Sequence, residues 1–160
     1  MAVANKVNTR QEVQAVGFYL GDDEYAIYIS TVREIVQMTE IRKIPKSPQF
    51  VEGVINIRGK IIPILDLRKR FDLSPSETKQ NAKILIVELE RNQVGLIVDN
   101  VSEVMRFYAD EIEKAPAMFA SNIDSQYKVK GAKINDKLVI ILDIERLLSF
   151  EEKSVLGSIA

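Results

Sequence analysis

The feature of this sequence that most limits its fold is an internal repeat. Two stretches, starting near residues 18 and 87, show the same order of apolar and charged residues at a constant offset of 69. Farther along, Gly53 matches Gly131 at an offset of 78, and Leu65-Asp66-Leu67 matches Leu142-Asp143-Ile144 at 77. The offset grows because the second copy has extra residues near 117–126. Because Glu, Pro, Gly and Asp also fall into register, duplication explains the pattern better than a chance alignment of apolar strands.

Each copy has the pattern of short strands joined by tight turns. Apolar residues alternate on both sides of Gly21-Asp22-Asp23 and Glu90-Arg91-Asn92, which predicts a hairpin at the start of each copy. Two further hairpins are predicted around Arg58-Gly59-Lys60, where Gly supplies a positive φ, and around Asn135-Asp136. About five short strands in some 70 residues cannot bury both faces as an open sheet, whereas closure into a small barrel removes the free edges.

Short helical turns are expected between these strands. Asp66 and Asp143 stand where they can cap turns over Leu67–Phe71 and Ile144–Leu148, and Ser30 stands where it can cap one over Thr31–Val36.

The sequence therefore predicts an all-β protein of two tandem five-stranded β-barrels with short helices. The expected division is a flexible segment over 1–12, a first barrel over 13–71, a linker over 72–81, a second barrel over 82–148 and a helical tail over 149–160. Barrels of this size have thin cores, so we expect each to depend on packing against the other. The seam between them is then expected to form a groove.

Composition excludes many kinds of chemistry. The chain has 160 residues, a formal net charge of −1, and neither His nor Cys. Zinc or haem ligation by these residues, disulfides, Fe–S clusters and imidazole catalysis are therefore excluded. The carboxylates form no evident catalytic pair, so we expect no enzyme activity, no metal and no cofactor. No apolar stretch reaches the length of a membrane span, which favours a cytoplasmic protein.

Arg58 is the most informative single residue. The surrounding run Gly53 to Lys60 superficially suggests a phosphate-binding loop, but its spacing is wrong and Ile61 stands where Ser or Thr should hold magnesium. The second copy has Asn135 at the equivalent turn, so the fold alone does not require the arginine. We therefore expect Arg58 to have a function beyond folding.

Nucleic-acid binding is an alternative function, because small barrels often bind nucleic acids. It would need a basic face with interleaved aromatic residues. Trp is absent, and positive and negative charges alternate along the whole chain. This alternative is therefore disfavoured.

Three segments resemble the CheW family of chemotaxis adaptors: the run from Phe50 to Leu67, the run from Gly95 to Val104, and the run from Leu138 to Ile144. The resemblance covers about residues 13–156 and implies two SH3-like barrels. It implies a non-enzymatic adaptor that couples methyl-accepting chemoreceptors to the histidine kinase CheA in membrane-attached arrays. A CheW-like adaptor of a related pathway, such as twitching motility or second-messenger control, remains an alternative.

The resemblance also implies two kinds of binding residue. Residues matching the receptor-binding groove between the barrels are Ile29, Val32, Glu34, Ile35, Arg58, Val98, Val101 and Val104, with Glu34 and Arg58 paired. Residues matching the contacts with the regulatory domain of CheA are Met38, Ile41, Ile44, Lys114, Met118 and Phe119. Met118 stands where some members have an acidic residue, which leaves the polar part of that contact open.

Overall fold

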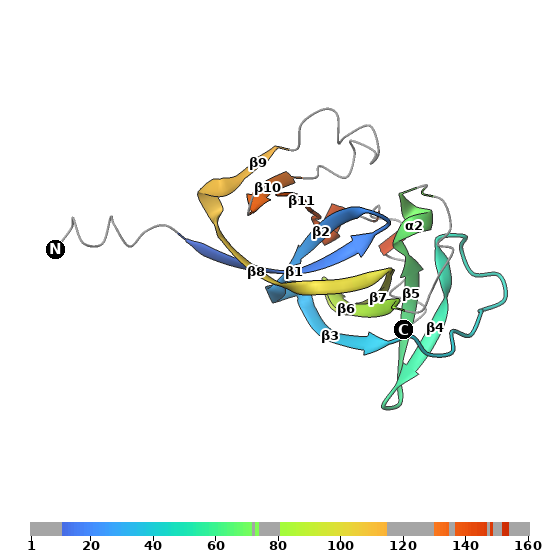
Figure 1. Cartoon of the computed structure of the whole chain (residues 1–160). Coiled ribbons are helices and arrows are strands. Elements are labelled where there is room, and N and C mark those ends of the chain that lie inside the picture. The colour runs from blue at the N-terminus through green and yellow to red at the C-terminus, as the bar shows by residue number, and fades with distance from the viewer. Residues whose placement is uncertain are drawn as a thin grey trace.

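The computed structural model describes residues 11–71, 73, 81–114, 130–134, 137–146, 148 and 152–153, most of them in β-strands (Figure 1). The strands are β1 (Glu12–Leu20), β2 (Asp23–Tyr28), β3 (Val32–Gln37), β4 (Val51–Ile57), β5 (Lys60–Asp66), β6 (Lys83–Leu89), β7 (Asn92–Val98), β8 (Asn100–Tyr108), β9 (Ile112–Lys114), β10 (Lys130–Ile134) and β11 (Lys137–Ile141). The short helical turns are η1 (Ile29–Thr31), α2 (Leu67–Arg70), η2 (Ala109–Glu111) and η4 (Ile144–Arg146).

The strands form two sheets. One has the order β3-β6-β7-β5-β4 and is called barrel I; the other has the order β8-β1-β2-β11-β10-β9 and is called barrel II. The predicted all-β architecture is confirmed, but barrel II has six strands rather than the five expected, because η2 separates β8 from β9.

The barrels do not follow the predicted division of the chain. The β1–β2 hairpin pairs with β8 and β11, while the β6–β7 hairpin pairs with β3 and β5. The boundaries 13–71 and 82–148 are therefore wrong for the barrels. Barrel I is the continuous segment 32–98, and barrel II is assembled from strands on either side of it. Alternating apolar residues predict a hairpin, but they do not specify which sheet the hairpin joins.

The strand register supports the duplication. Val16 pairs with Ile27 as Leu85 pairs with Leu96, so the offset of 69 holds in the structure. The parallel contacts of the two barrels also correspond, because Ile141 pairs with Ala26 as Ile64 pairs with Gly95. Each copy thus gives its first hairpin to the barrel of the other copy. The expected match of Gly53 with Gly131 is one residue off, since Gly53 pairs with Ile64 and Lys130 with Ile141.

Both sheets close on themselves. In barrel I, the chain after β3 turns back onto β4, and Arg42 and Val54 exchange backbone hydrogen bonds of 2.9 and 2.8 Å. In barrel II, β9 follows β8 through η2 and pairs with β10. Gly53 allows the first closure, because a Cβ atom at this position would lie 2.3 Å from the Arg42 carbonyl oxygen.

Two of the three expected helical turns are confirmed. The Asp66 carboxylate accepts a hydrogen bond of 2.9 Å from the Arg68 amide at the start of α2. The Asp143 carboxylate does the same for Glu145 at 3.0 Å beside η4. The turn expected over Thr31–Val36 is wrong: the helical turn is η1, and β3 begins directly after it. The β-branched residues of this segment favour a strand once β6 is available to pair with it.

Among the residues that the structure describes, three apolar clusters make up the core. Barrel I encloses Ile55, Ile62, Ile64, Ile84 and Ile86, and barrel II encloses Ala15, Ala26, Met105, Phe107, Val139 and Ile141. The third and largest cluster lies between the barrels; its members from the two exchanged hairpins are Val16, Phe18, Leu20, Tyr25, Ile27, Leu85, Val87, Leu89, Val94, Leu96 and Val98. The barrels are thus joined by a continuous apolar interface.

The expected terminal segments and linker fall mostly outside the described residues. Of the segment 1–12, Gln11 and Glu12 are described, and Glu12 already belongs to β1. Of the segment 72–81, Leu73 packs against the core between the barrels. Of the tail 149–160, residues 152 and 153 are described and are helical.

Tyr25 predicts a loss of stability in alkali. Its ring is 1% exposed and stacks between Phe18 and Phe71 at centroid distances of 5.8 and 6.1 Å. Burial raises the pKa of Tyr25 from 10.0 to about 12. The unfolded chain therefore loses this proton first, so the contribution of the neutral phenol is intact below pH 10 and is lost as pH rises towards 12. We expect Tyr25→Phe to remove roughly 1.4 kcal/mol of alkaline loss between pH 8 and pH 11, about half of the full effect of two pKa units, measured by urea unfolding at both pH values. An unchanged pH dependence in Tyr25→Phe would contradict the prediction, with Tyr19→Phe as control.

Gly53 predicts a specific sensitivity of barrel I. In Gly53→Ala, the added Cβ must displace the backbone of Arg42, which holds the barrel closed. We expect the free energy of unfolding to fall by about 2 kcal/mol or more. Gly59→Asn is the matched control, because no atom lies within 4 Å of a Cβ at Gly59 and Asn tolerates its positive φ of 84°. Equal losses in both variants would refute the role of Gly53 in closure.

Candidate protein-binding surface

Arg58 occupies a tight turn that strains an ordinary side chain. The turn joins β4 and β5 in a hairpin that projects from the body of the molecule (Figure 1). Arg58 and Gly59 have φ values of 52° and 84°, so the positive φ predicted for Gly59 is confirmed. The Asn56 side chain accepts a hydrogen bond of 2.9 Å from the Gly59 amide. Asn or Gly would fit the left-handed conformation of Arg58 with less strain.

That guanidinium pairs with Glu34. Its two terminal nitrogens donate hydrogen bonds of 3.2 and 2.7 Å to the two carboxylate oxygens, so the expected pairing is present. Glu34 lies at an irregularity of β3, where two residues of β3 correspond to one of β6. Its bond to Arg58 holds the pKa of Glu34 below the ordinary value, and the carboxylate raises the pKa of Arg58. The pair is therefore fully charged at neutral pH, and the Arg58 side chain is 74% exposed.

Apolar side chains run from the core to the surface along both barrels. In barrel I, Leu96 pairs with Leu85, and Leu85 pairs with Ile35 on the outermost strand. In barrel II, Val16 pairs in the same way with Val104. Directly opposed residues share one face of a sheet, so each row begins in the core between the barrels and ends at the surface. Ile35 and Val104 are 45% and 49% exposed.

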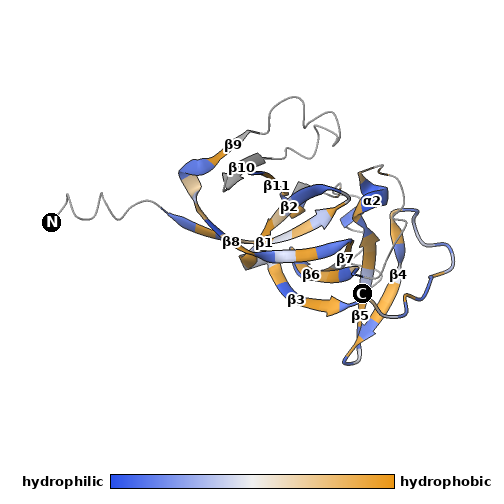
Figure 2. Ribbon diagram, viewed as in Figure 1, coloured by the Kyte–Doolittle hydropathy of each residue, from blue (hydrophilic) through white to orange (hydrophobic). Residues whose placement is uncertain are grey.

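Two partly buried valines accompany them. Val32 on β3 and Val101 on β8 both pack against the core between the barrels. We call Val32, Ile35, Val101 and Val104 the seam strip. In Figure 1 both strands run across the front of the molecule, and Figure 2 shows hydrophobic residues on β3 and alternating along β8.

The two remaining predicted groove residues, Ile29 and Val98, differ in their exposure to solvent. Ile29 is 39% exposed in η1, which contacts both β1 and β6 and so touches both barrels. Val98 is 0% exposed within the core between the barrels, so its expected place on a binding surface is wrong. The chain fills the seam at this point with its own side chains, because β7 is buried on the face that packs against barrel II.

The described members of the second predicted group lie outside β3 and β8. Met38 and Ile41 pack against the interior cluster of barrel I, and Ile44 is partly exposed in the loop that follows. Lys114 ends β9 of barrel II, where it pairs with Lys130. Met118 and Phe119 lie outside the described residues.

A cluster that sequence reasoning missed links the two barrels. Arg68 of α2 donates hydrogen bonds of 2.8 Å from Nε and 2.5 Å from a terminal nitrogen to the two Asp99 oxygens. The Gly21 amide donates to the same carboxylate at 2.7 Å. These hydrogen bonds and the Arg68 charge hold the pKa of Asp99 below its ordinary value against the effect of burial. No motif connects residues that lie 31 and 78 positions apart.

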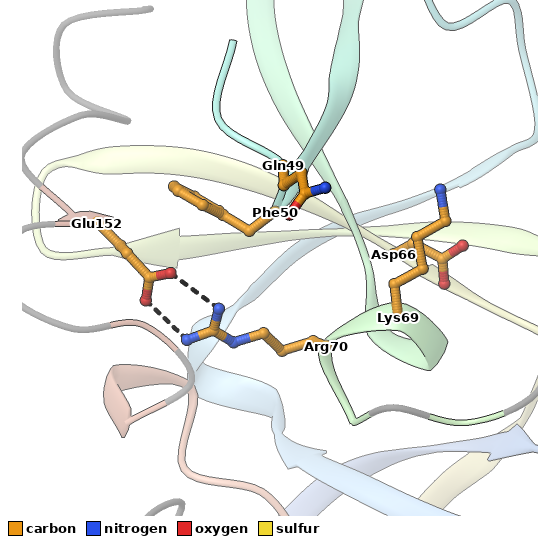
Figure 3. A pocket seen from close by; sticks show the side chains of 6 residues that line it. All are labelled: Gln49, Phe50, Asp66, Lys69, Arg70 and Glu152. Carbon is orange, nitrogen blue, oxygen red and sulfur yellow. Dashed lines mark hydrogen bonds and ion pairs between the residues drawn. The ribbon is translucent and has the colours of Figure 1, made fainter.

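A polar cavity of about 500 Å³ lies beside α2 (Figure 3). Arg70 donates two hydrogen bonds of 2.9 and 2.7 Å to Glu152, and Lys69 pairs with Glu52 at 2.5 Å. Both cations of the lining are thus engaged by carboxylates of the chain. In the described part of the chain no group of acidic residues could hold a metal ion, and no helix is long and apolar enough to cross a membrane.

Comparisons with known proteins agree with this architecture. The model of the CheW-like domain matches residues 14–152. The chain is 35% identical to the chemotaxis protein CheW of Klebsiella aerogenes, covering 89% of this chain and 86% of that protein. It is 32% identical to CheW of Helicobacter pylori, covering 92% and 88%. The crystal structure of the scaffolding protein TtCheW from Thermoanaerobacter tengcongensis matches with a TM-score of 0.79 and 38% identity, covering 89% of this chain and 96% of that one. The chain belongs to the CheW family of chemotaxis adaptor proteins.

Proposed function

We propose that this protein couples methyl-accepting chemoreceptors to the histidine kinase CheA, by binding both without catalysing a reaction. The observation that supports receptor binding is the seam strip, where the core between the barrels continues to the surface. The partner contacted there is the helical tip of a chemoreceptor. An adaptor of a related chemosensory pathway would use the same surface with a different receptor.

The seam strip suits an amphipathic helix. Such a helix places its apolar face on an apolar surface and its polar flanks on a charged rim. Ile35 and Val104 are about half exposed, so covering both contributes on the order of 2 kcal/mol. This modest contribution fits a contact that becomes firm only when many copies are held together.

The ion pair of Glu34 and Arg58 supplies a rim beside the strip. A guanidinium has five N–H donors, and two of them hold the Glu34 carboxylate. The donors that remain face solvent on a side chain that is 74% exposed. In this proposal Arg58 binds a polar group of the receptor tip while Glu34 holds the guanidinium in place.

Binding of CheA uses other surfaces on both barrels. Ile44 and Lys114 provide contacts on barrels I and II, together with Met118 and Phe119. Met38 and Ile41 shape the barrel I surface from beneath, because they pack against its interior. Two contacts on separate barrels allow one adaptor to bridge kinase and receptor at membrane-attached arrays without entering the membrane. Titration of the CheA regulatory domain into this protein, with and without a receptor fragment, tests the bridge. Failure to bind either partner at tens of micromolar would refute it.

Polar substitution of the seam strip tests the receptor site. We expect Ile35→Gln and Val104→Gln each to weaken binding of a receptor tip fragment about three- to tenfold, since each removes part of the apolar contact. The measurement is isothermal titration. Both side chains are about half exposed, so the melting temperature should change little.

Ile61→Gln is the matched control for these variants. Ile61 is 40% exposed, similar to Ile35, but lies on β5, which contributes no residue to the strip. An equal loss of binding in Ile61→Gln would place the receptor contact elsewhere.

Arg58→Asn separates binding from folding. Asn adopts the left-handed conformation more readily than Arg, so we expect the free energy of unfolding to rise by about 0.5 kcal/mol. Receptor-dependent activation of the kinase should fall at the same time, because the guanidinium is lost. Chemical unfolding and a reconstituted kinase assay measure the two effects. A marked loss of stability would instead identify Arg58 as a structural residue.

A further inference from the structure

The apolar residues that barrel I gives to the seam strip are nearly equivalent to those that barrel II gives. Ile35 corresponds to Val104, and Val32 to Val101, at the offset of 69 that relates the two copies. Their cross-strand partners correspond as well, since Ile35 faces Leu85 as Val104 faces Val16. A helix that met only these apolar side chains would bind in two opposite directions with similar affinity. A directional contact therefore needs a feature that the repeat does not share.

Apart from the remaining donors of Arg58, the charges along β3 cannot provide that feature by attraction alone. Arg33 forms an ion pair with Glu88, and Glu34 forms one with Arg58. The barrel I rim of the strip therefore carries charges that are already compensated within the chain. Gln37, farther along β3, is exposed and uncharged.

The corresponding positions of β8 differ in charge and in pairing. Glu103 is the counterpart of Glu34, but the counterpart of Arg58 in the sequence is Asn135. Arg106 is the counterpart of Gln37. Both Glu103 and Arg106 are exposed, and neither has an ion-pair partner among the residues that the structure describes. Barrel II thus presents a base on the face of β8 that carries Val104, and an acid at the β-bulge between Val101 and Val104.

We infer that Glu103 and Arg106 set the direction in which a partner helix lies on the seam strip. The helix that fits carries a basic side chain opposite Glu103 and an acidic one opposite Arg106. In the reverse direction these partner charges would lie against barrel I, where the acid and base are already paired. Charge complementarity of this kind contributes more to orientation than to affinity. The inference rests on the proposed receptor site and names the residues that determine its specificity.

Because the repeat makes Ile35 and Val104 equivalent, their methyl groups can report the direction of a bound helix. We would label the methyl groups of Ile35 and Val104 and add a receptor tip fragment that carries a nitroxide at one end of the helix. In the unmodified protein, we expect the nitroxide to broaden one of the two methyl signals and to leave the other sharp. Two exposed charge pairs sustain a preference on the order of tenfold for one direction.

Variants of Glu103 and Arg106 test whether these residues set the direction of the helix. In an Arg58→Asn background, which removes the other group that the repeat does not share, Glu103→Gln and Arg106→Gln together should make both methyl signals broaden to a similar extent, although the fragment still binds. With Glu103→Arg and Arg106→Glu together, the pattern should reverse. Glu24→Gln combined with Arg91→Gln is the control, since it makes the same net change of charge near the turns of the β1–β2 and β6–β7 hairpins and alters no residue of β3 or β8.

Two other outcomes would contradict the inference. The same one-sided broadening in all variants would overturn the role of Glu103 and Arg106 but leave the receptor site standing. Broadening of neither methyl group at saturating fragment would overturn the receptor site, and this inference with it.

Discussion

The apolar contact between the barrels is the interaction on which the rest of the structure depends. It is formed mainly by the β1–β2 and β6–β7 hairpins, whose strands are buried on both faces. In β6, Ile84 and Ile86 fill the interior of barrel I, while Leu85 and Val87 pack between the barrels. This double burial explains the unbroken apolar run at 84–87, which differs from the alternation of a strand with one solvated face. Val32 of β3 and Val101 of β8 both pack against this contact.

Much of the local structure could be predicted from the sequence, because turns and caps depend on neighbouring residues. Gly59 has the predicted positive φ, and the Asp66 and Asp143 side chains cap the expected helical turns. The exchange of hairpins between copies could not be predicted. An identical pattern of apolar residues would result if each hairpin joined the barrel of its own copy. The free energies of the two arrangements differ only through long-range packing, which a single sequence does not reveal.

The candidate site was predictable to a similar degree. The expected Glu34–Arg58 pair is present, and Ile35 and Val104 are exposed, while receptor binding at the seam strip stays a prediction. Val98 was misassigned, because a valine at a strand end has the same pattern whether it contacts a partner or the protein's own core. The cluster of Arg68, Asp99 and Gly21 left no signal, since its members belong to three separate turns. Long-range polar contacts of this kind become visible only once the chain is folded.

The nesting of one barrel within the sequence of the other has a consequence for synthesis. As the chain leaves the ribosome, the β1–β2 hairpin emerges first, yet its neighbours β8 and β11 are among the last strands to appear. Barrel I is complete once Val98 has emerged, so it can fold while the nascent hairpin beside it still has two unpaired edges. Barrel I can then cover the apolar face of that hairpin until β8 and β11 have been synthesised. The order of translation and the order of assembly thus differ for the two halves of a duplicated protein.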